Sequence, residues 1–259
     1  MKLPELATLE GTLGRICRAR LEDYANTSLE LGAPREPKHR FENSLSGSGL
    51  KLIAEVKRSS PRGAVSLGLN ALEAAKAYAA GGASALSVLT EPRDFNGSLE
   101  DLIEVVNNLD LPVLRKDFTV HPKMLLEAAD AGASAVLLLV NVLEQDTKAY
   151  LEASHHLGLD ALVEVHTESE LEIALDAKAR IIGVNNRDLK TLDINLGTAP
   201  RVGLLAREYD FEGVLIALSG YSNRAELISL EGVFDAVLVG SSLAGSDSIE
   251  ASTRALLGG

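Results

Sequence analysis

The sequence predicts a single closed (β/α)8 barrel, a TIM barrel, with a helical extension before it. Short apolar segments alternate with amphipathic segments from residue 50 onwards, which is typical of a parallel sheet covered on its outer side. Eight such segments occur between residues 50 and 259, which favours a closed barrel over an open sheet. The turn after the first segment also lacks the glycine-rich G-x-G-x-x-G motif of a dinucleotide-binding open sheet.

Composition excludes several classes of protein. The chain has 259 residues and a formal net charge of −12, which argues against nucleic acid as a partner because a phosphate backbone attracts a basic surface. No apolar run approaches the roughly 20 residues of a membrane span, and the first residues do not resemble a secretory signal. The single cysteine, Cys17, cannot form an internal disulfide, so we expect a cytoplasmic protein.

Residues 1–49 form the predicted extension, which consists of one helix and a linker. Apolar residues recur with helical spacing in residues 9–24. Residues 32–37 contain two prolines and break the helix, and residues 44–49 are predicted to be a flexible loop. We expect Cys17 to be a small buried hydrophobe and nothing in this extension to carry chemistry.

Eight segments rich in aliphatic and β-branched residues are the predicted strands of the barrel domain, residues 50–259. They are residues 52–56, 85–89, 112–115, 135–139, 161–165, 181–184, 214–218 and 236–239. Between them, residues 71–80, 99–107 and 169–176 show helical patterns. Glycines recur just before strands, where a helix ends and the chain turns.

Polar residues collect at the carboxyl ends of these strands, where barrel enzymes hold their active sites. Because alternate residues of a strand share a face, Glu55 and Lys57 both point into the mouth if Ile53 points into the barrel. Lys116 and Glu164 are placed in the same way on their strands. Each charge alone could belong to a structural ion pair. However, a lysine beside a carboxylate is also the arrangement that separates the pKa values of a general acid and a general base. The set therefore favours an active site.

Two loops indicate a phosphate site. Ser219 and Gly220 follow the seventh strand, and Gly240 and Ser241 follow the eighth, which is where barrel enzymes commonly bind phosphate on backbone N–H groups. A serine that merely caps a helix would explain the second loop alone. The two loops together carry the prediction.

The histidines show no pattern of metal ligation. No spacing of cysteine and histidine resembles a zinc site, so we expect neither a metal nor a cofactor. We expect His121, His155 and His156 to lie on the solvated surface. His166, two residues after Glu164, either lines the mouth or lies on its rim.

Five segments, in order, resemble the indole-3-glycerol phosphate synthase family. They are residues 53–61, 87–91 with 95–98, 114–118, 183–189 and 239–243. The resemblance covers nearly the whole chain, including the helix that this family places before its barrel. It implies ring closure of 1-(2-carboxyphenylamino)-1-deoxyribulose 5-phosphate to indole-3-glycerol phosphate, carbon dioxide and water, in tryptophan biosynthesis.

The resemblance also implies a role for each matching residue. Lys116 would be the general acid that protonates the ketone oxygen, and Glu164 would be the general base of the later dehydration. Lys57 would hold the anthranilate carboxylate and donate a proton in the dehydration, with Glu55 and Asn185 orienting these groups. The implied catalytic set is Lys116, Glu164, Lys57, Glu55, Asn185 and Ser219.

The other matching residues would bind the substrate. Arg187 would grip the anthranilate group, and Phe95 and Phe118 would wall its aromatic ring. The residues implied to bind the phosphate are Ser60, Gly220, Gly240 and Ser241.

Two positions depart from the family pattern. Leu218 stands where the family usually has glutamate before Ser-Gly, and Arg62 replaces a small residue. We expect activity to persist, with weaker positioning of the substrate. Two other interpretations stay open: a barrel in which Lys116 forms a Schiff base with a phosphosugar, as in aldolases, and a non-catalytic relative that binds a phosphometabolite. We expect a monomer with a small anionic phosphosugar as substrate and no nucleic-acid or membrane partner.

Overall fold

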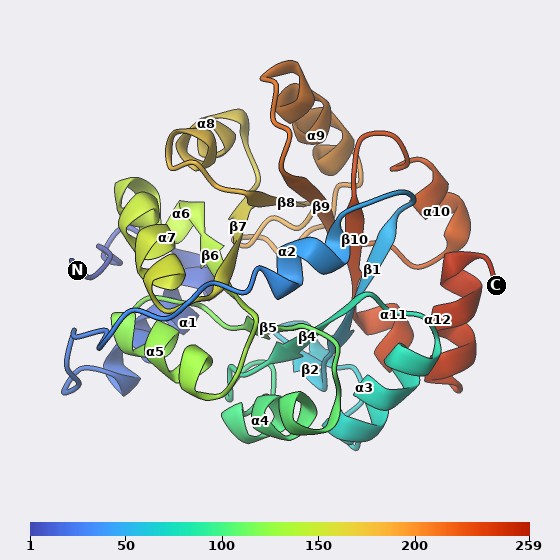
Figure 1. Ribbon diagram of the computed structural model, residues 1–259, viewed down its shortest axis with the longest axis horizontal. Helices are drawn as coiled ribbons and strands as arrows, with labels where there is room; N and C mark the ends of the chain where they lie inside the picture. The colour runs from blue at the N-terminus through green and yellow to red at the C-terminus, as the bar shows by residue number, and fades with distance from the viewer.

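The protein, described over residues 1–259 by a computed structural model, contains a closed barrel of eight parallel strands in the order β1-β10-β9-β8-β7-β6-β5-β4 (Figure 1). The strands are β1 (Lys51–Val56), β4 (Ala85–Leu89), β5 (Val113–Lys116), β6 (Ala135–Leu139), β7 (Asp160–Val165), β8 (Ile181–Asn185), β9 (Val214–Leu218) and β10 (Ala236–Val239). The predicted fold class is confirmed, and every predicted strand is present with each end within one residue of its predicted position.

Helices surround the barrel. They are α3 (Ala71–Ala80), α4 (Leu99–Asn108), α5 (Pro122–Asp130), α6 (Val140–Leu143), α7 (Thr147–His156), α8 (Glu168–Asp176), α9 (Thr198–Glu208), α10 (Arg224–Ile228), α11 (Ser241–Ala244) and α12 (Ile249–Leu257), with a 3-10 turn η1 (Glu144–Asp146). A two-stranded hairpin, β2 (Ser59–Ser60) with β3 (Gly63–Ala64), lies in the loop after β1. None of the helices has both the length and the apolar character needed to cross a membrane.

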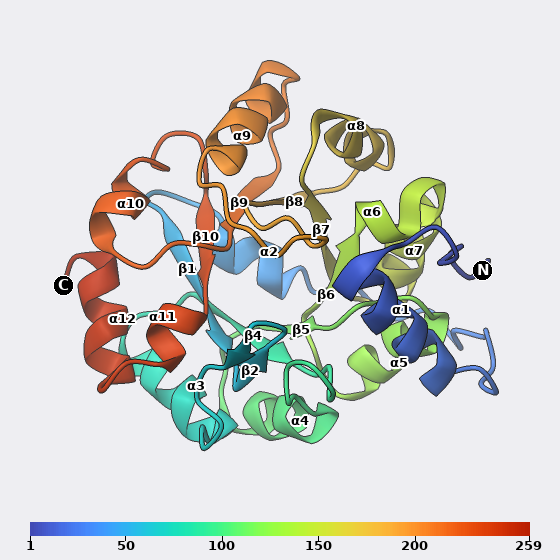
Figure 2. The same ribbon diagram turned by 180° about the vertical axis from the view of Figure 1, so that it is seen from behind.

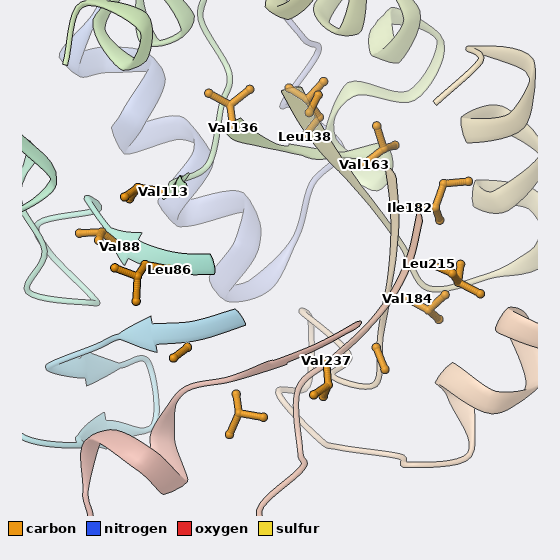
Figure 3. Close-up of a cluster of buried hydrophobic side chains, with 14 of the residues drawn as sticks. Leu86, Val88, Val113, Val136, Leu138, Val163, Ile182, Val184, Leu215 and Val237 are labelled. Atoms are coloured by element: carbon orange, nitrogen blue, oxygen red, sulfur yellow. The ribbon is translucent and has the colours of Figure 1, made fainter. Parts of the chain in front are cut away.

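Alternation along the strands divides the buried side chains into two clusters. Leu86, Val88 and their counterparts on the other strands face outwards and pack against the surrounding helices (Figure 3). Ile53, Leu114 and Leu162 belong to the cluster that fills the barrel interior. Ile53 therefore points inwards, and the charged residues two or more positions further along the same face reach the mouth, as predicted.

Two helices, not one, precede the barrel. They are α1 (Gly11–Asp23) and α2 (Arg40–Leu45). Figure 1 shows α2 across the near end of the barrel, and Figure 2, seen from behind, shows α1 in front at the opposite end. The extension thus contacts both ends of the barrel.

The prediction of a flexible loop at residues 44–49 is wrong for its first residues, because Leu45 is fully buried and ends α2. The backbone N–H groups of Phe41 and Glu42 both donate to Oδ2 of Asp160, at 3.1 Å each. A carboxylate at the start of β7 therefore caps this short helix. Since the cap comes from a distant strand, the local sequence carries no sign of it.

Candidate active site

Two small cavities lie at the carboxyl ends of the barrel strands. The central cavity has a volume of about 80 Å³, and all six predicted catalytic residues line it, together with Arg187, Phe95 and Phe118. The second cavity, of about 50 Å³, shares those last three residues and adds Ser60. The structure therefore brings ten of the thirteen predicted site residues into one region.

Glu55 lies between the two lysines. The Nζ atom of Lys57 is 3.5 Å from Oε1 of Glu55, and the Nζ atom of Lys116 is 4.0 Å from Oε2. Ser87 donates a hydrogen bond to Oε2 at 3.3 Å. Burial raises the pKa of Glu55, but the two ammonium charges outweigh it and hold this pKa below its usual value. A buried carboxylate thus stays ionised between two cations.

The surroundings of Lys57 hold its pKa below the usual value of a lysine. Burial lowers its pKa, the nearby charges of Lys116 and Arg187 lower it further, and the attraction of Glu55 only partly compensates. Its ammonium group also lies 5.7 Å from the centre of the Phe95 ring, within the range of a cation–π contact.

Glu164 is buried and held from one side only. The amide nitrogen of Asn185 donates to its Oε1 at 2.7 Å, while its Oε2 has no hydrogen-bond partner. The amide oxygen of Asn185 accepts from the backbone N–H of Arg187 at 2.9 Å, which keeps the amide nitrogen turned towards Glu164. The free Oε2 is therefore an available proton acceptor.

The aromatic pair forms an apolar wall of the site. The rings of Phe95 and Phe118 lie 5.9 Å apart, tilted by 42°. In the same cavity lining, the guanidinium group of Arg187 donates to the carbonyl oxygen of Leu192 at 2.9 Å. A flat ring that carries a carboxylate fits this combination of aromatic faces and cations.

Of the four residues implied to bind phosphate, only Ser60 lines one of these cavities. Gly240 lies against Glu55: a Cβ atom there would be 2.7 Å from Oε1 and 3.1 Å from Cβ of Glu55, so a larger residue would displace this carboxylate. Ser241 begins α11 and is exposed. The hydroxyl group of Ser242 donates to the carbonyl oxygen of Tyr221 at 3.3 Å, which joins the loops after β9 and β10.

Gly220 has a φ of +94°, a backbone conformation that favours glycine. A Cβ atom there would lie within 3 Å of Ile194 and Leu196, two residues of the loop after β8. Of the two predicted phosphate loops, the one after β9 thus reaches the central cavity through Ser219, while Gly220, Gly240 and Ser241 line neither cavity.

The sequence did not predict one element of the site, a buried ion pair at Asp117, the residue that follows Lys116. Asp117 accepts hydrogen bonds from Nε and Nη2 of Arg20, at 3.0 and 2.9 Å, and from the hydroxyl group of Thr90 at 2.6 Å. A signal was available, because Arg20 falls three residues after Cys17 on the buried face of α1. The extension, expected to be chemically silent, contacts the neighbour of a predicted catalytic residue.

The predicted surface position of His121 is wrong. Its side chain is 2% exposed, its Nδ1 caps α5 by accepting from the backbone N–H of Lys123 at 3.1 Å, and its ring stacks on Tyr24. His155 and His156 are half-buried. His121 is buried because the extension covers it, which a local pattern cannot indicate.

His166 lies on the rim, beside Glu164. It lines a third cavity of about 620 Å³, which adjoins the central one and is open to solvent.

The one group of three close side chains that could ligate a metal, His39, Glu42 and Asp160, lies at the other end of the barrel, by the α2 cap.

Comparisons with known proteins agree with each other. The family model described as Indole-3-glycerol phosphate synthase matches residues 15–256. A protein of that name from Deinococcus radiodurans is 52% identical, over 98% of this chain and 97% of its own. Another from Aquifex aeolicus is 42% identical, over 91% of this chain and 92% of its own.

Solved structures resemble the chain in fold. KGPDC from Streptococcus mutans superposes with a TM-score of 0.61 at 15% identity, over 81% of this chain and 96% of the other. Thiamine phosphate pyrophosphorylase from Pyrococcus furiosus gives a TM-score of 0.59 at 17% identity, over 83% and 95%. At such low identity the likeness concerns the barrel alone.

Proposed function

Because this chain belongs to the indole-3-glycerol phosphate synthase family, we propose how its own side chains divide the work of that family's reaction. The chain is a carbon–carbon lyase of tryptophan biosynthesis. It converts 1-(2-carboxyphenylamino)-1-deoxyribulose 5-phosphate to indole-3-glycerol phosphate with loss of carbon dioxide and water. The observation that carries the assignment of roles is the row Lys57–Glu55–Lys116 in the same cavity as Glu164.

In the ring closure, Lys116 is the general acid. It donates its proton to the ketone oxygen as the aromatic carbon attacks, which prevents a full negative charge from building up on that oxygen. Glu55, 4.0 Å from Nζ of Lys116, holds the ammonium group in place. Loss of carbon dioxide then restores the aromatic ring.

In the dehydration, Glu164 is the general base and Lys57 the acid. The unpartnered Oε2 of Glu164 accepts the proton, and Lys57 protonates the hydroxyl group that leaves as water. The lowered pKa of Lys57 makes that donation easier. Asn185 holds Glu164 by a hydrogen bond, and Ser219 lines the same cavity.

Substrate binding follows from charge and shape. Lys57 and Arg187 attract the carboxylate, and Phe95 and Phe118 stack beside the ring. Ser60, Gly220, Gly240 and Ser241 are the proposed phosphate ligands, supported by the contact that joins the loops after β9 and β10. An acidic chain that gathers cations at one mouth draws an anionic substrate there.

A turnover assay with the anilino-deoxyribulose phosphate tests the proposal. The chain has no tryptophan, so the fluorescence of the indole product rises without tryptophan background from the enzyme. We expect turnover by the unmodified chain and a loss of about 10³-fold in Lys116→Met and in Glu164→Gln. Wild-type turnover in either variant would contradict its role.

Borohydride trapping separates this reaction from the aldolase alternative. A Schiff base between Lys116 and a ketose phosphate would be reduced to a stable adduct. We expect no adduct, because the proposed role of Lys116 involves only a proton. That the chain is a monomer and that it lies in the cytoplasm both stay predictions. Sedimentation of the purified chain tests the first.

A further inference from the structure

His166 faces the proposed base from outside the central cavity. Its Nε2 lies 3.6 Å from Oε1 of Glu164, and its Nδ1 lies 3.1 Å from Oε2 of Glu170. Glu170 also accepts from the backbone N–H of His166, at 2.8 Å, and its own N–H donates to Thr167, the N-cap of α8. The first turn of α8 therefore fixes the imidazole ring in place.

The hydrogen-bond chemistry defines the state of the ring. An ionised carboxylate only accepts, so the Nδ1 that faces Glu170 carries hydrogen. In the neutral ring, Nε2 is then a bare acceptor turned towards another carboxylate. This Nε2 and Oε2 of Glu164 are both buried without a partner. A proton placed between His166 and Glu164 removes the mismatch between the two acceptors.

We propose that His166 takes from Glu164 the proton that this base collects during dehydration, and passes it to solvent. A half-turn of the carboxyl group of Glu164 brings the new hydrogen to face Nε2 of His166. The O–H bond then breaks as the N–H bond forms, and Nδ1 releases its hydrogen to Glu170 or to water. Proton exchange with water in the third cavity, which takes the hydrogen from Nε2 and returns one to Nδ1, restores the starting form of the ring. Glu164 returns to the carboxylate needed for the next turnover. The proposal rests on the role given to Glu164 above.

The third cavity provides the exit. It is open to solvent, and His166, Glu170 and Asn185 line it. The other charged groups in its lining are Glu144 on η1 and Asp188, Lys190 and Asp193 on the loop after β8. Three of these four groups are carboxylates, so the cavity favours a departing proton.

The surroundings also suit a ring that becomes charged. Burial lowers the pKa of His166, but the hydrogen bond to Glu170 and the charges of Glu164, Glu170 and Asp188 outweigh it and raise this pKa above its usual value. A histidine with these neighbours is a sufficiently strong base to accept the proton.

His166→Gln is the first test, in the purified full-length chain with the anilino-deoxyribulose phosphate. We expect kcat to fall about tenfold with KM within about twofold, a smaller loss than the 10²–10⁴-fold of a general base, because cavity water replaces the relay in part. His155→Gln, a half-buried histidine of α7, is the matched control and should keep wild-type kcat.

Imidazole rescue distinguishes proton transfer from support of the fold. In His166→Ala, we expect added imidazole to restore kcat in proportion to its concentration, and weaker bases of the same size to restore less.

In Glu170→Gln the ring keeps a hydrogen-bond partner but loses a negative charge. We expect the limb of the kcat–pH profile that belongs to His166 to move to lower pH.

Two results would overturn the relay: wild-type kcat and an unchanged pH profile in His166→Gln, or a loss of kcat that no imidazole derivative restores although the variant folds. Glu164→Gln separates this failure from that of the assigned base. If Glu164→Gln is inactive while His166→Gln is fully active, only the relay is wrong. If Glu164→Gln keeps wild-type turnover, the assignment of the base is wrong as well.

Discussion

Arg20 on α1 and Asp117 at the end of β5 form a buried ion pair with two hydrogen bonds, of 3.0 and 2.9 Å. Asp117 directly follows Lys116, the proposed general acid. The N-terminal helix is therefore anchored to the backbone that carries this lysine, so the extension supports both the stability of the barrel and the geometry of its mouth.

Arg20→Met breaks this pair and leaves the buried carboxylate of Asp117 with only the longer contact to Arg115, at 3.5 Å, and the hydrogen bond from Thr90. We expect the free energy of unfolding, measured in urea, to fall by about 3–5 kcal/mol, with a parallel drop in kcat. Arg15→Met is the control on the same helix: its pair with Asp94 is exposed on the arginine side, so about 1 kcal/mol or less should be lost. Equal losses in both variants would contradict the role of Arg20.

Glu55→Gln removes the negative charge between the two lysines. Because Glu55 raises the pKa of Lys57, its loss should lower that pKa further. An acid is active only below its pKa, so the alkaline limb of the kcat–pH profile should move to lower pH, with kcat reduced by about 10²-fold. A limb that stays in place would mean that Lys57 is not the acid.

Gly240→Ala forces a Cβ atom to within 2.7 Å of Glu55. We expect the displaced carboxylate to cost about 1–3 kcal/mol of stability and at least tenfold in kcat/KM. Gly68→Ala is the control, because nothing lies within 4 Å of its Cβ position and its φ is not in the left-handed region. Wild-type kinetics in Gly240→Ala would show that Glu55 tolerates the shift.

Buried His121 makes stability depend on pH. Burial lowers its pKa, so the unfolded chain binds this proton at a higher pH than the folded chain does. Stability from this group is present above the usual histidine pKa, about 6.5, and is lost as pH falls through the lowered value. His121→Asn retains an N-cap without a titration, so its urea midpoint should fall less between pH 7 and 5. Parallel curves would refute this.

Leu218→Glu restores the carboxylate that the family usually has. Leu218 is buried and lines the central cavity, so a glutamate there would face the substrate and its cationic neighbours. We expect kcat/KM to rise by about tenfold and stability to fall, because a buried charge loses hydration. Leu218→Gln has the same shape without the charge. If neither turnover nor substrate binding improves in the glutamate variant, the missing carboxylate does not limit this enzyme.

The barrel and most of the site were predictable because both follow from local patterns. Aliphatic runs mark strands such as β6 and β9, and the carboxyl ends of parallel strands meet at one mouth, so residues far apart in sequence are collected by topology. The rest depends on contacts between distant segments. Asp160 caps α2, Tyr24 covers His121, and Arg20 reaches Asp117, and none of these pairs has a periodic signal.

The small volume of the two central cavities has a kinetic consequence. Together they hold about 130 Å³, whereas sites for small molecules commonly span about 300–1,000 Å³. Leu189 lines both, and Leu13 of α1 lines the second. We expect Leu13 and Leu189 to separate before a substrate of this size fills the two central cavities. The observed rate of association should then level off as substrate concentration rises, at the rate at which these side chains move apart.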